Sequence, residues 1–488
     1  MSPAHHSHER RWAVLAVVVL VVAGVAIAAG TRGAPAPAAA PAVSSALVSA
    51  PNAESSAWYC TGQSTGSGIS PGFLILTNTT GRSVAASITA VSDAGATVHT
   101  AVAVPAHAVA TPSIPSLPSG SWESQTVTVS GGGVALSQAV HGSSGWSEAP
   151  CQSTTAASWY FPSGTTANSD PLYISLLNPT STPVVVDLTF MTPTGAVHPI
   201  NYQGIVLQSG EVQVENVASE VQNASTVSTV VATRTGRVVA SEVQGFSGSS
   251  AGLALVPGAV DPESRWTIPQ NRDTEGSSSE IDVFNPGAVP ESVTVRLRLG
   301  SGPLAPLADS VAPGATWVLA TGKQTRIPHD ATYSADIEAT GGPGVVVGRT
   351  VVLPSSDPAP QAGMALAVDG VSAASPTGTW VVPPPGTSAT LAVDGAAPTS
   401  LALTNTSGAT EHYTAYALTS SGERSLAVGT LPPGNTALVA GAALLAAGLD
   451  PIVAAAGGPL AVSEDVGPSG GIGVVTMPGL PLAAPIAF

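Results

Sequence analysis

Apolar and polar residues alternate along four short segments of the chain, and each segment ends at an asparagine. In the first segment, Leu74 and Leu76 stand four and two positions before Asn78. Since successive side chains of a strand point to opposite faces, this period-two pattern predicts a half-buried β-strand. The segments that align on their asparagines are Phe73–Asn78, Tyr173–Asn178, Glu280–Asn285 and Ser400–Asn405.

Further signals stand at matching positions in the four copies. Each copy begins with a tryptophan, and a glycine stands seventeen residues after each asparagine. We expect this glycine to adopt a positive φ in a hairpin, which glycine does without steric cost. The tryptophans are Trp58, Trp159, Trp266 and Trp380, and the glycines are Gly95, Gly195, Gly302 and Gly422.

The second half of each copy contains a turn that leads into a strand, followed by a late apolar strand. The turns read VPAH, LQSG, VAPG and LPPG and begin at Val104, Leu207, Val311 and Leu431. The late strands are predicted at Val134–Gln138, Val238–Glu242, Val345–Arg349 and Leu460–Glu464.

Repeats of this length favour one fold class. A unit of about 100 residues, with short strands and a turn signal every 8–12 residues or so, is typical of an immunoglobulin-like sandwich. The predicted fold is therefore all-β, with four tandem immunoglobulin-like β-sandwich modules in a row after an N-terminal transmembrane helix. A closed, propeller-like ring of four sheets is the alternative, although propeller blades are normally shorter. Helical periodicity within the units is limited to Thr436–Gly448.

The amino-terminal region predicts export. Residues 12–30 contain no charged side chain and directly follow Arg10 and Arg11. About 20 apolar residues span a bilayer core, and basic residues stay on the cytoplasmic side. We expect an uncleaved signal-anchor in the cell membrane, with the bulk of the chain extracytoplasmic. A cleaved secretory signal that ends near Ala26-Ile27-Ala28 is the alternative, and it also exports the rest of the chain.

These signals divide the chain into seven parts. We expect a cytoplasmic tail (1–11), the signal-anchor (12–30), a Pro/Ala-rich linker (31–57) and four β modules (58–150, 151–256, 257–366 and 367–488). Alternating proline and alanine in the linker favours an extended, semi-rigid spacer.

Charge argues against one class of partner. The chain has 30 acidic and 14 basic side chains, which gives a formal net charge of −16. Because the phosphates of nucleic acids require a basic surface, we expect no nucleic-acid partner.

The two cysteines, Cys60 and Cys151, lack the spacing of metal or redox motifs. An even number of cysteines in an exported protein is typical of structural disulfides. We predict a bridge that joins the two ends of the first module.

The aromatic residues allow two interpretations. A tryptophan repeated at one position of a sandwich favours a buried core position. Trp122, Trp146 and Trp317 fall outside the repeated column and are the candidates for stacking on a glycan.

The asparagines also allow two interpretations. The repeated asparagine predicts turn chemistry, because its side chain can bond the nearby backbone. Separately, Asn78, Asn223 and Asn405 begin sequences that fit the glycosylation acceptor.

No catalytic constellation emerges from the sequence. Two Gly-x-Ser-x-Gly matches, at 248–252 and 467–471, lie in predicted loops, whereas a nucleophile elbow needs a strand-to-helix turn. The histidines that follow the anchor are isolated and lack metal-ligand spacing. We expect no metal, no cofactor and no enzymatic activity.

One position of the late strands changes its chemistry between copies. A catalytic residue would not vary in this way, so we expect these side chains on an outward strand face. The residues are Gln138, Glu242, Arg349 and Glu464.

Three short sequences resemble those of an uncharacterised family of actinobacterial proteins, domain of unknown function 5719. They are Trp58-Tyr59-Cys60, Cys151 ahead of Trp159-Tyr160-Phe161, and Leu-Leu-Asn-Pro-Thr at 176–180. The resemblance covers the chain from Trp12 onwards. It implies a membrane segment and an exported region of β repeats, but no functional residues.

The sequence thus favours a membrane-anchored structural or interaction protein of the bacterial cell envelope. Its partners would be the membrane and envelope proteins or cell-wall glycans. The alternatives are a cell-wall glycan-binding protein and a hydrolase with a site between modules.

Overall fold

The computed structural model describes residues 46–484 and 486, with gaps at 65–68, 118, 143–144, 248–249, 274–275, 329–330, 355–360, 371–376, 385–395 and 469–474. The predicted signal-anchor at 12–30 lies outside these residues. No helix in the described part of the chain is long and apolar enough to cross a membrane. The described residues belong to one compact unit, Val43–Phe488.

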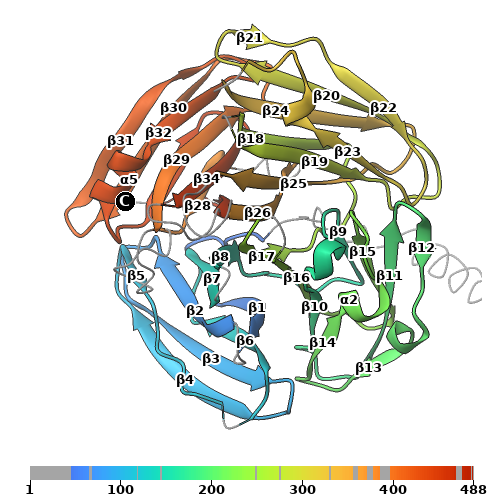
Figure 1. Ribbon diagram of the computed structural model, residues 1–488. Helices are drawn as coiled ribbons and strands as arrows, with labels where there is room; N and C mark the ends of the chain where they lie inside the picture. Colours follow the sequence, from blue (N-terminus) through green and yellow to red (C-terminus); the bar gives the residue numbers. More distant parts are fainter. Residues whose placement is uncertain are drawn as a thin grey trace, which may run out of the picture. The chain divides into compact units, whose positions relative to one another are not determined.

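Antiparallel strands dominate this unit and fall into four consecutive groups, which we call modules 1 to 4 (Figure 1). Module 1 comprises β1 (Ser56–Ser64), β2 (Ile69–Asn78), β3 (Val84–Ser92), β4 (Thr97–Val104), β5 (Ala108–Ala110), β6 (Trp122–Val129), β7 (Val134–Gly142) and β8 (Gly145–Pro150). Module 2 comprises β9 (Ser158–Phe161), β10 (Leu172–Leu177), β11 (Val184–Thr192), β12 (Gly195–Val197), β13 (Ile205–Leu207), β14 (Val212–Asn216), β15 (Ser228–Thr235), β16 (Val239–Phe246) and β17 (Gly252–Pro257).

Modules 3 and 4 repeat the plan. Module 3 comprises β18 (Arg265–Asp273), β19 (Ser278–Phe284), β20 (Glu291–Leu299), β21 (Gly302–Pro303), β22 (Leu307–Val311), β23 (Thr316–Ala320), β24 (Ala331–Thr340), β25 (Val346–Leu353), β26 (Gln361–Leu366) and β27 (Val368–Asp369). Module 4 comprises β28 (Thr379–Val382), β29 (Ala396–Asn405), β30 (Glu411–Thr419), β31 (Gly422–Leu431), β32 (Thr436–Ala440), β33 (Ile452–Ala456), β34 (Leu460–Pro468), β35 (Val475–Pro478) and β36 (Leu480–Pro481). The short helices are η1 (Ala167–Ser169), η2 (Ile200–Tyr202), α2 (Val217–Glu220), η3 (Thr321–Lys323) and α5 (Gly441–Ala447).

Each module contains two sheets. The inner sheet carries the strand that ends at the repeated asparagine, and its order is β5-β2-β7-β8 in module 1. The outer sheet carries the tryptophan strand, with the order β1-β6-β3-β4. The other inner sheets are β14-β10-β16-β17, β23-β19-β25-β26 and β32-β29-β34-β35, and the other outer sheets contain β9, β18 and β28.

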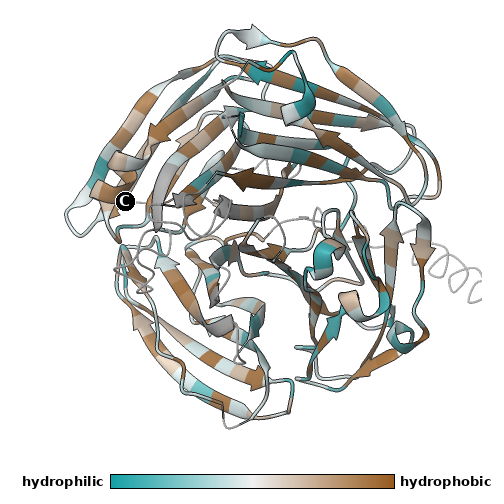
Figure 2. Cartoon of the chain, in the orientation of Figure 1, coloured by the Kyte–Doolittle hydropathy of each residue, from teal (hydrophilic) through white to brown (hydrophobic). Residues whose placement is uncertain are grey.

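The apolar faces of the two sheets form one core in each module. Strand β3 alternates between buried and more exposed positions along its whole length, and Figure 2 shows such alternation as bands along the strands. Burial removes the apolar face from water, which provides most of the favourable free energy of folding. The four repeated tryptophans are at most 2% exposed, so their predicted core position is confirmed.

The predicted hairpin glycines are also confirmed. Gly95, Gly195, Gly302 and Gly422 all have a positive φ, between 79° and 125°. Thr436–Gly448 is only partly helical, because β32 precedes the seven-residue helix α5.

The modules close into a circuit rather than lying in a row. Strand β8 contacts β17, β17 contacts β26, β26 contacts β35, and β35 contacts β8 (Figure 1). At the closure, Val48 and Leu482 form a parallel bridge. The prediction of a row is therefore wrong, and the structure combines sandwich modules with the closure of the ring alternative. Period-two alternation along a strand does not reveal whether a neighbouring module covers its second face.

The segment that leaves each module pairs with the tryptophan strand of the same module, and we call it the exit segment. The pairs are Tyr59 with Gln152, Tyr160 with Ala259, Trp266 with Asp369 and Trp380 with Pro481. Strand β27 therefore belongs with module 3, although we assigned residues from 367 onwards to the fourth module. Spacing between tryptophans cannot locate a boundary that long-range pairing sets.

Candidate functional site

The disulfide lies where the exit segment of module 1 crosses β1. Cys60 and Cys151 are joined and fully buried, with a Cα–Cα distance of 4.7 Å, as predicted. The matching pairs in modules 2, 3 and 4 are Phe161/Gly258, Ile268/Ala367 and Val382/Gly479. A Cβ on Gly258 would lie 2.8 Å from Phe161 Cζ. In every module, the exit segment therefore crosses the tryptophan strand at one matching pair of residues. In modules 2, 3 and 4 this pair is a larger and a smaller apolar residue, and in module 1 it is the disulfide.

The repeated asparagine does more than shape a turn. Asn285 is fully buried, and its Nδ2 donates to the carbonyls of Val289 and Val311. Its Oδ1 accepts from the backbone N–H of Gly287. Val311 ends β22 in the outer sheet, so the amide links the two sheets of the sandwich. Asn78, Asn178 and Asn405 make the same set of bonds.

These bonds decide which acceptor sequences are accessible. Asn78 and Asn405 are buried and use their amide groups in the turn, so a glycosylation enzyme cannot reach them in the folded protein. Asn223 is exposed.

Polar side chains join neighbouring modules at the strand that ends in asparagine. The hydroxyls of Thr61 and Ser175 lie 2.5 Å apart across the junction of modules 1 and 2. Ser163 Oγ donates to Asp282 Oδ2 between modules 2 and 3, and Ser400 Oγ donates to Gln270 Oε1 between modules 3 and 4. The junctions are therefore specific hydrogen-bonded contacts.

The late-strand residues expected on an outward face are instead buried. Gln138 and Arg349 are each 3% exposed, and Glu242 and Glu464 are fully buried. Gln138 bonds Gln63 and the carbonyl of Thr61, and Arg349 forms an ion pair with Asp465 of module 4. The outward prediction is wrong because each of these residues stands opposite an apolar core residue of the neighbouring strand, as Glu242 does opposite Ile174 and Arg349 opposite Ile281. Directly opposed residues of an antiparallel pair share one face, so these side chains lie on the face that packs against the outer sheet.

Burial makes the ionised form of Glu242 and Glu464 unfavourable. Neither carboxylate oxygen of Glu242 or of Glu464 has a hydrogen-bond partner among the described residues. Burial, and then the charge of Asp282, raise the pKa of Glu242 well above its ordinary value. Burial also raises the pKa of Asp282 to about 7. Burial, with Glu148 of module 1 and Asp465, raises the pKa of Glu464.

A second, outer contact recurs at the junctions, and one copy departs from it. The residue thirteen positions after each repeated asparagine is Val91, Met191, Arg298 or Leu418. Val91 and Met191 pack against the core of the following module. Arg298 departs in its charge and not in its place: a Cβ on Gly434, in the turn of module 4, would be 2.3 Å from Arg298 Cζ, just as a Cβ on the matching Gly314 of module 3 would be 3.3 Å from Met191 Sδ.

A pocket accompanies this departure at the junction of modules 3 and 4, and we call it the junction pocket. Its cavity volume is ≈ 220 Å³, and Arg298, Tyr333, Ser334, Asn435 and Thr436 are among the residues that line it. Burial raises the pKa of Tyr333 to about 12, so this phenol stays protonated at neutral pH. The junction pocket is the strongest candidate site, because polar groups from two modules converge where the repeat pattern breaks.

The three tryptophan candidates do not form one surface. Trp146 is 1% exposed and packs with Ile75, Ala139 and Val466, so it is not available for stacking on a glycan. Trp122 is half-buried and lies 5.0 Å from the ring of Tyr173 in module 2. Trp317, on β23, is half-buried against the core of module 3.

Comparison with known proteins places the chain in a family. A profile of the family of unknown function DUF5719 matches residues 133–442, which include parts of all four modules. The chain belongs to the DUF5719 family. No curated protein has a significant sequence match to it.

Two solved structures show weak likeness to this DUF5719 protein. A protein of Thermotoga maritima is 16% identical, with a TM-score of 0.19, over 22% of this chain and 93% of its own. The tetra-tandem repeat in the extending region of a large adhesion protein is 11% identical, with a TM-score of 0.10, over 84% of this chain and 94% of its own. At these TM-scores, neither structure informs the fold.

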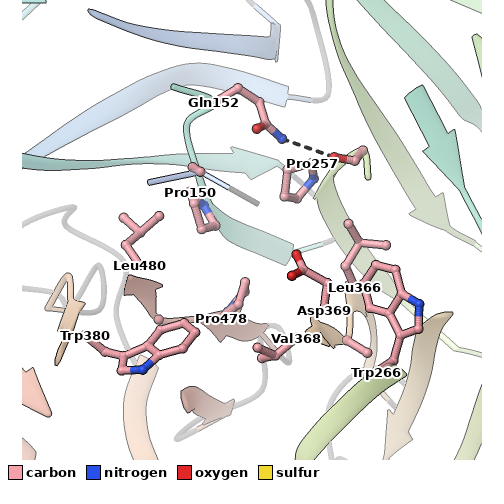
Figure 3. A pocket seen from close by; sticks show the side chains of 14 residues that line it. Pro150, Gln152, Pro257, Trp266, Leu366, Val368, Asp369, Trp380, Pro478 and Leu480 are labelled. Carbon is pink, nitrogen blue, oxygen red and sulfur yellow. Dashed lines mark hydrogen bonds between the residues drawn. The ribbon is translucent and has the colours of Figure 1, made fainter. Parts of the chain in front are cut away.

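The centre of the circuit in this DUF5719 protein is nearly filled. Residues from all four modules line a central pocket, including Pro150, Pro257, Asp369 and Pro478. Figure 3 shows Trp266 and Trp380 on opposite sides of it, with Asp369 between them. Its cavity volume of ≈ 20 Å³ holds about one water molecule. This pocket therefore has room for little more than one water molecule.

Proposed function

We propose that this protein is a membrane-anchored, extracytoplasmic structural or interaction protein of the bacterial cell envelope. The predicted signal-anchor at 12–30 and the buried Cys60–Cys151 disulfide support export, since structural disulfides persist on the oxidising side of a membrane.

The closed circuit is the observation that carries the structural role. The repeated tryptophan, asparagine and glycine each have a folding task, and polar bonds such as Ser163–Asp282 fix the junctions between modules. We further propose that each module is immunoglobulin-like, which is supported by two antiparallel sheets around one core. Such a body suits the presentation of surfaces at a fixed distance from the membrane.

The test fuses a reporter enzyme that is active only outside the cytoplasm after Phe488 of the full chain. We expect reporter activity, retention in the membrane fraction after alkaline carbonate extraction, and an oxidised Cys60–Cys151 pair. A matched fusion that lacks residues 12–30 should be inactive. Reporter silence with the full chain, or free thiols in cells, would contradict the proposal.

Interaction requires a separate test. Cross-linking of the full chain in intact cells should yield a defined adduct with an envelope protein or a cell-wall glycan. If no adduct forms under conditions that capture a known envelope complex, the interaction role fails.

A second candidate function, glycan binding, is favoured by the junction pocket rather than by the tryptophans. The pocket presents hydroxyl and amide side chains beside apolar ones, a combination that recognises small polar ligands.

A further inference from the structure

The junction pocket differs from the other outer contacts in one charged residue. Arg298 occupies the position of Val91 and Met191, which are apolar and pack on the next module. Its Nε lies 3.3 Å from Asp336 Oδ2, and its side chain is 30% exposed. Among the described residues, neither η nitrogen of Arg298 donates a hydrogen bond. A guanidinium with unused donors next to a cavity is suited to an oxygen ligand.

The charge of the residues that line the junction pocket favours an anionic ligand. Arg298 is the only charged side chain among the described residues that line the pocket, and no carboxylate lines it. Guanidinium groups bind carboxylates with two parallel N–H donors, which strengthens and orients the contact.

The volume of the junction pocket and its uncharged lining residues limit the size and shape of the ligand. A cavity of ≈ 220 Å³ is smaller than the roughly 300–1,000 Å³ of pockets for drug-sized ligands, so it suits a single small ring. Ser334, Asn435 and Thr436 offer groups that match ring hydroxyls. Leu438 is 47% exposed at the same pocket and offers an apolar surface for the ring face.

We propose that the junction pocket binds one sugar unit that carries a carboxylate, with Arg298 as the group that binds the carboxylate. The inference rests on the second candidate function, glycan binding, and not on the export of the chain. It also assigns a purpose to the charged residue at this position of the repeat.

The test is calorimetric titration of the purified full chain with D-glucuronate. We expect saturable binding by the natural protein and at least about tenfold weaker binding by Arg298→Met, since hydrogen bonds to charged groups contribute about 1.5–3 kcal/mol. Met191 holds the matching position in module 2, so this variant should fold, and its thermal transition should stay within a few degrees of the natural one.

Arg296→Met is the matched control. Arg296 lies on the same strand, pairs with Glu338 at 2.6 Å and does not line the pocket, so glucuronate affinity should not change. Absence of glucuronate binding, or equal affinity in Arg298→Met, overturns the proposal. D-glucose binding as tightly as glucuronate overturns the role of the carboxylate, and acetate binding as tightly overturns the role of the sugar ring. None of these outcomes bears on export, which the reporter fusion tests.

Discussion

At the scale of single residues, buried polar side chains hold this protein together. The repeated asparagine satisfies backbone groups at the end of one sheet and at the edge of the other, as Asn285 does with Val289 and Val311. Buried backbone carbonyls without partners are costly, so these positions tolerate little change.

Replacement of Asn285 by alanine should therefore destabilise the protein. Two carbonyls and one N–H lose their partner, and we expect a loss of about 2–4 kcal/mol in the free energy of unfolding. Urea denaturation measures the effect. Asn52→Ala is the control, because Asn52 is exposed and has no positive φ, so its replacement should change stability by less than about 0.5 kcal/mol. Equal effects of the two variants would refute a linking role for Asn285.

The buried glutamate of module 2 predicts a pH dependence. The pKa values of Glu242 and Asp282 are raised in the folded state, so folding favours their protonated forms. Stability from these groups is complete below pH 4, near their unfolded pKa values, and is lost as pH rises through about 7 and above.

Glu242→Gln should reduce this loss. Module 1 carries Gln138 at the matching position, so the amide fits the fold. At pH 8 we expect the variant to be more stable than the natural protein, since every unit by which burial raises the pKa of Glu242 corresponds to about 1.4 kcal/mol. Thermal unfolding between pH 5 and 8 checks this, with the exposed Glu54→Gln as control. A natural protein whose stability does not fall over this range would contradict the prediction.

At the scale of elements, the crossing of exit segment and tryptophan strand is the conserved geometry of the four copies. A disulfide fills it in module 1, and Ile268 with Ala367 fills it in module 3. Because the backbones pair in the same way, the crossing in module 3 should also accept a disulfide.

The double variant Ile268→Cys with Ala367→Cys tests this equivalence. We expect an oxidised bridge that raises stability by up to about 4 kcal/mol, since it closes a long loop. Thiol titration and thermal unfolding, with and without reductant, provide the measurement. The single-cysteine variants are the controls, and free thiols in the double variant under oxidising conditions would show that the crossings differ.

At the scale of the whole molecule, closure of the circuit connects the start and the end of the body. Val48 and Leu482 are fully buried and bridged, and the backbone N–H of Ala483 donates to the carbonyl of Val48. Module 1 thereby meets module 4 without a covalent link at the junction.

Val48→Asp should open the circuit and loosen the core of module 1, to which Val48 also belongs, while the β-sheets stay formed. An unpaired carboxylate at this buried site costs several kcal/mol. Small-angle scattering should show a larger radius of gyration, while circular dichroism keeps its β-sheet signal. Val206→Asp, at a half-exposed position, should leave the scattering unchanged. An unchanged radius for Val48→Asp would mean that other contacts suffice for closure.

Local rules in the sequence determined the strands, the hairpin glycines, the tryptophan cores and the disulfide. Each depends on residues close in the chain or on chemistry that recurs in every copy. Tertiary structure alone decided the circuit, the burial of Glu242 and Glu464, and the junction pocket beside Arg298. The physical reason is that alternation reports only that one face of a strand is apolar. Whether a Ser or Asp on the other face meets water or a neighbouring module depends on contacts between residues more than 100 positions apart, such as Ser163 with Asp282.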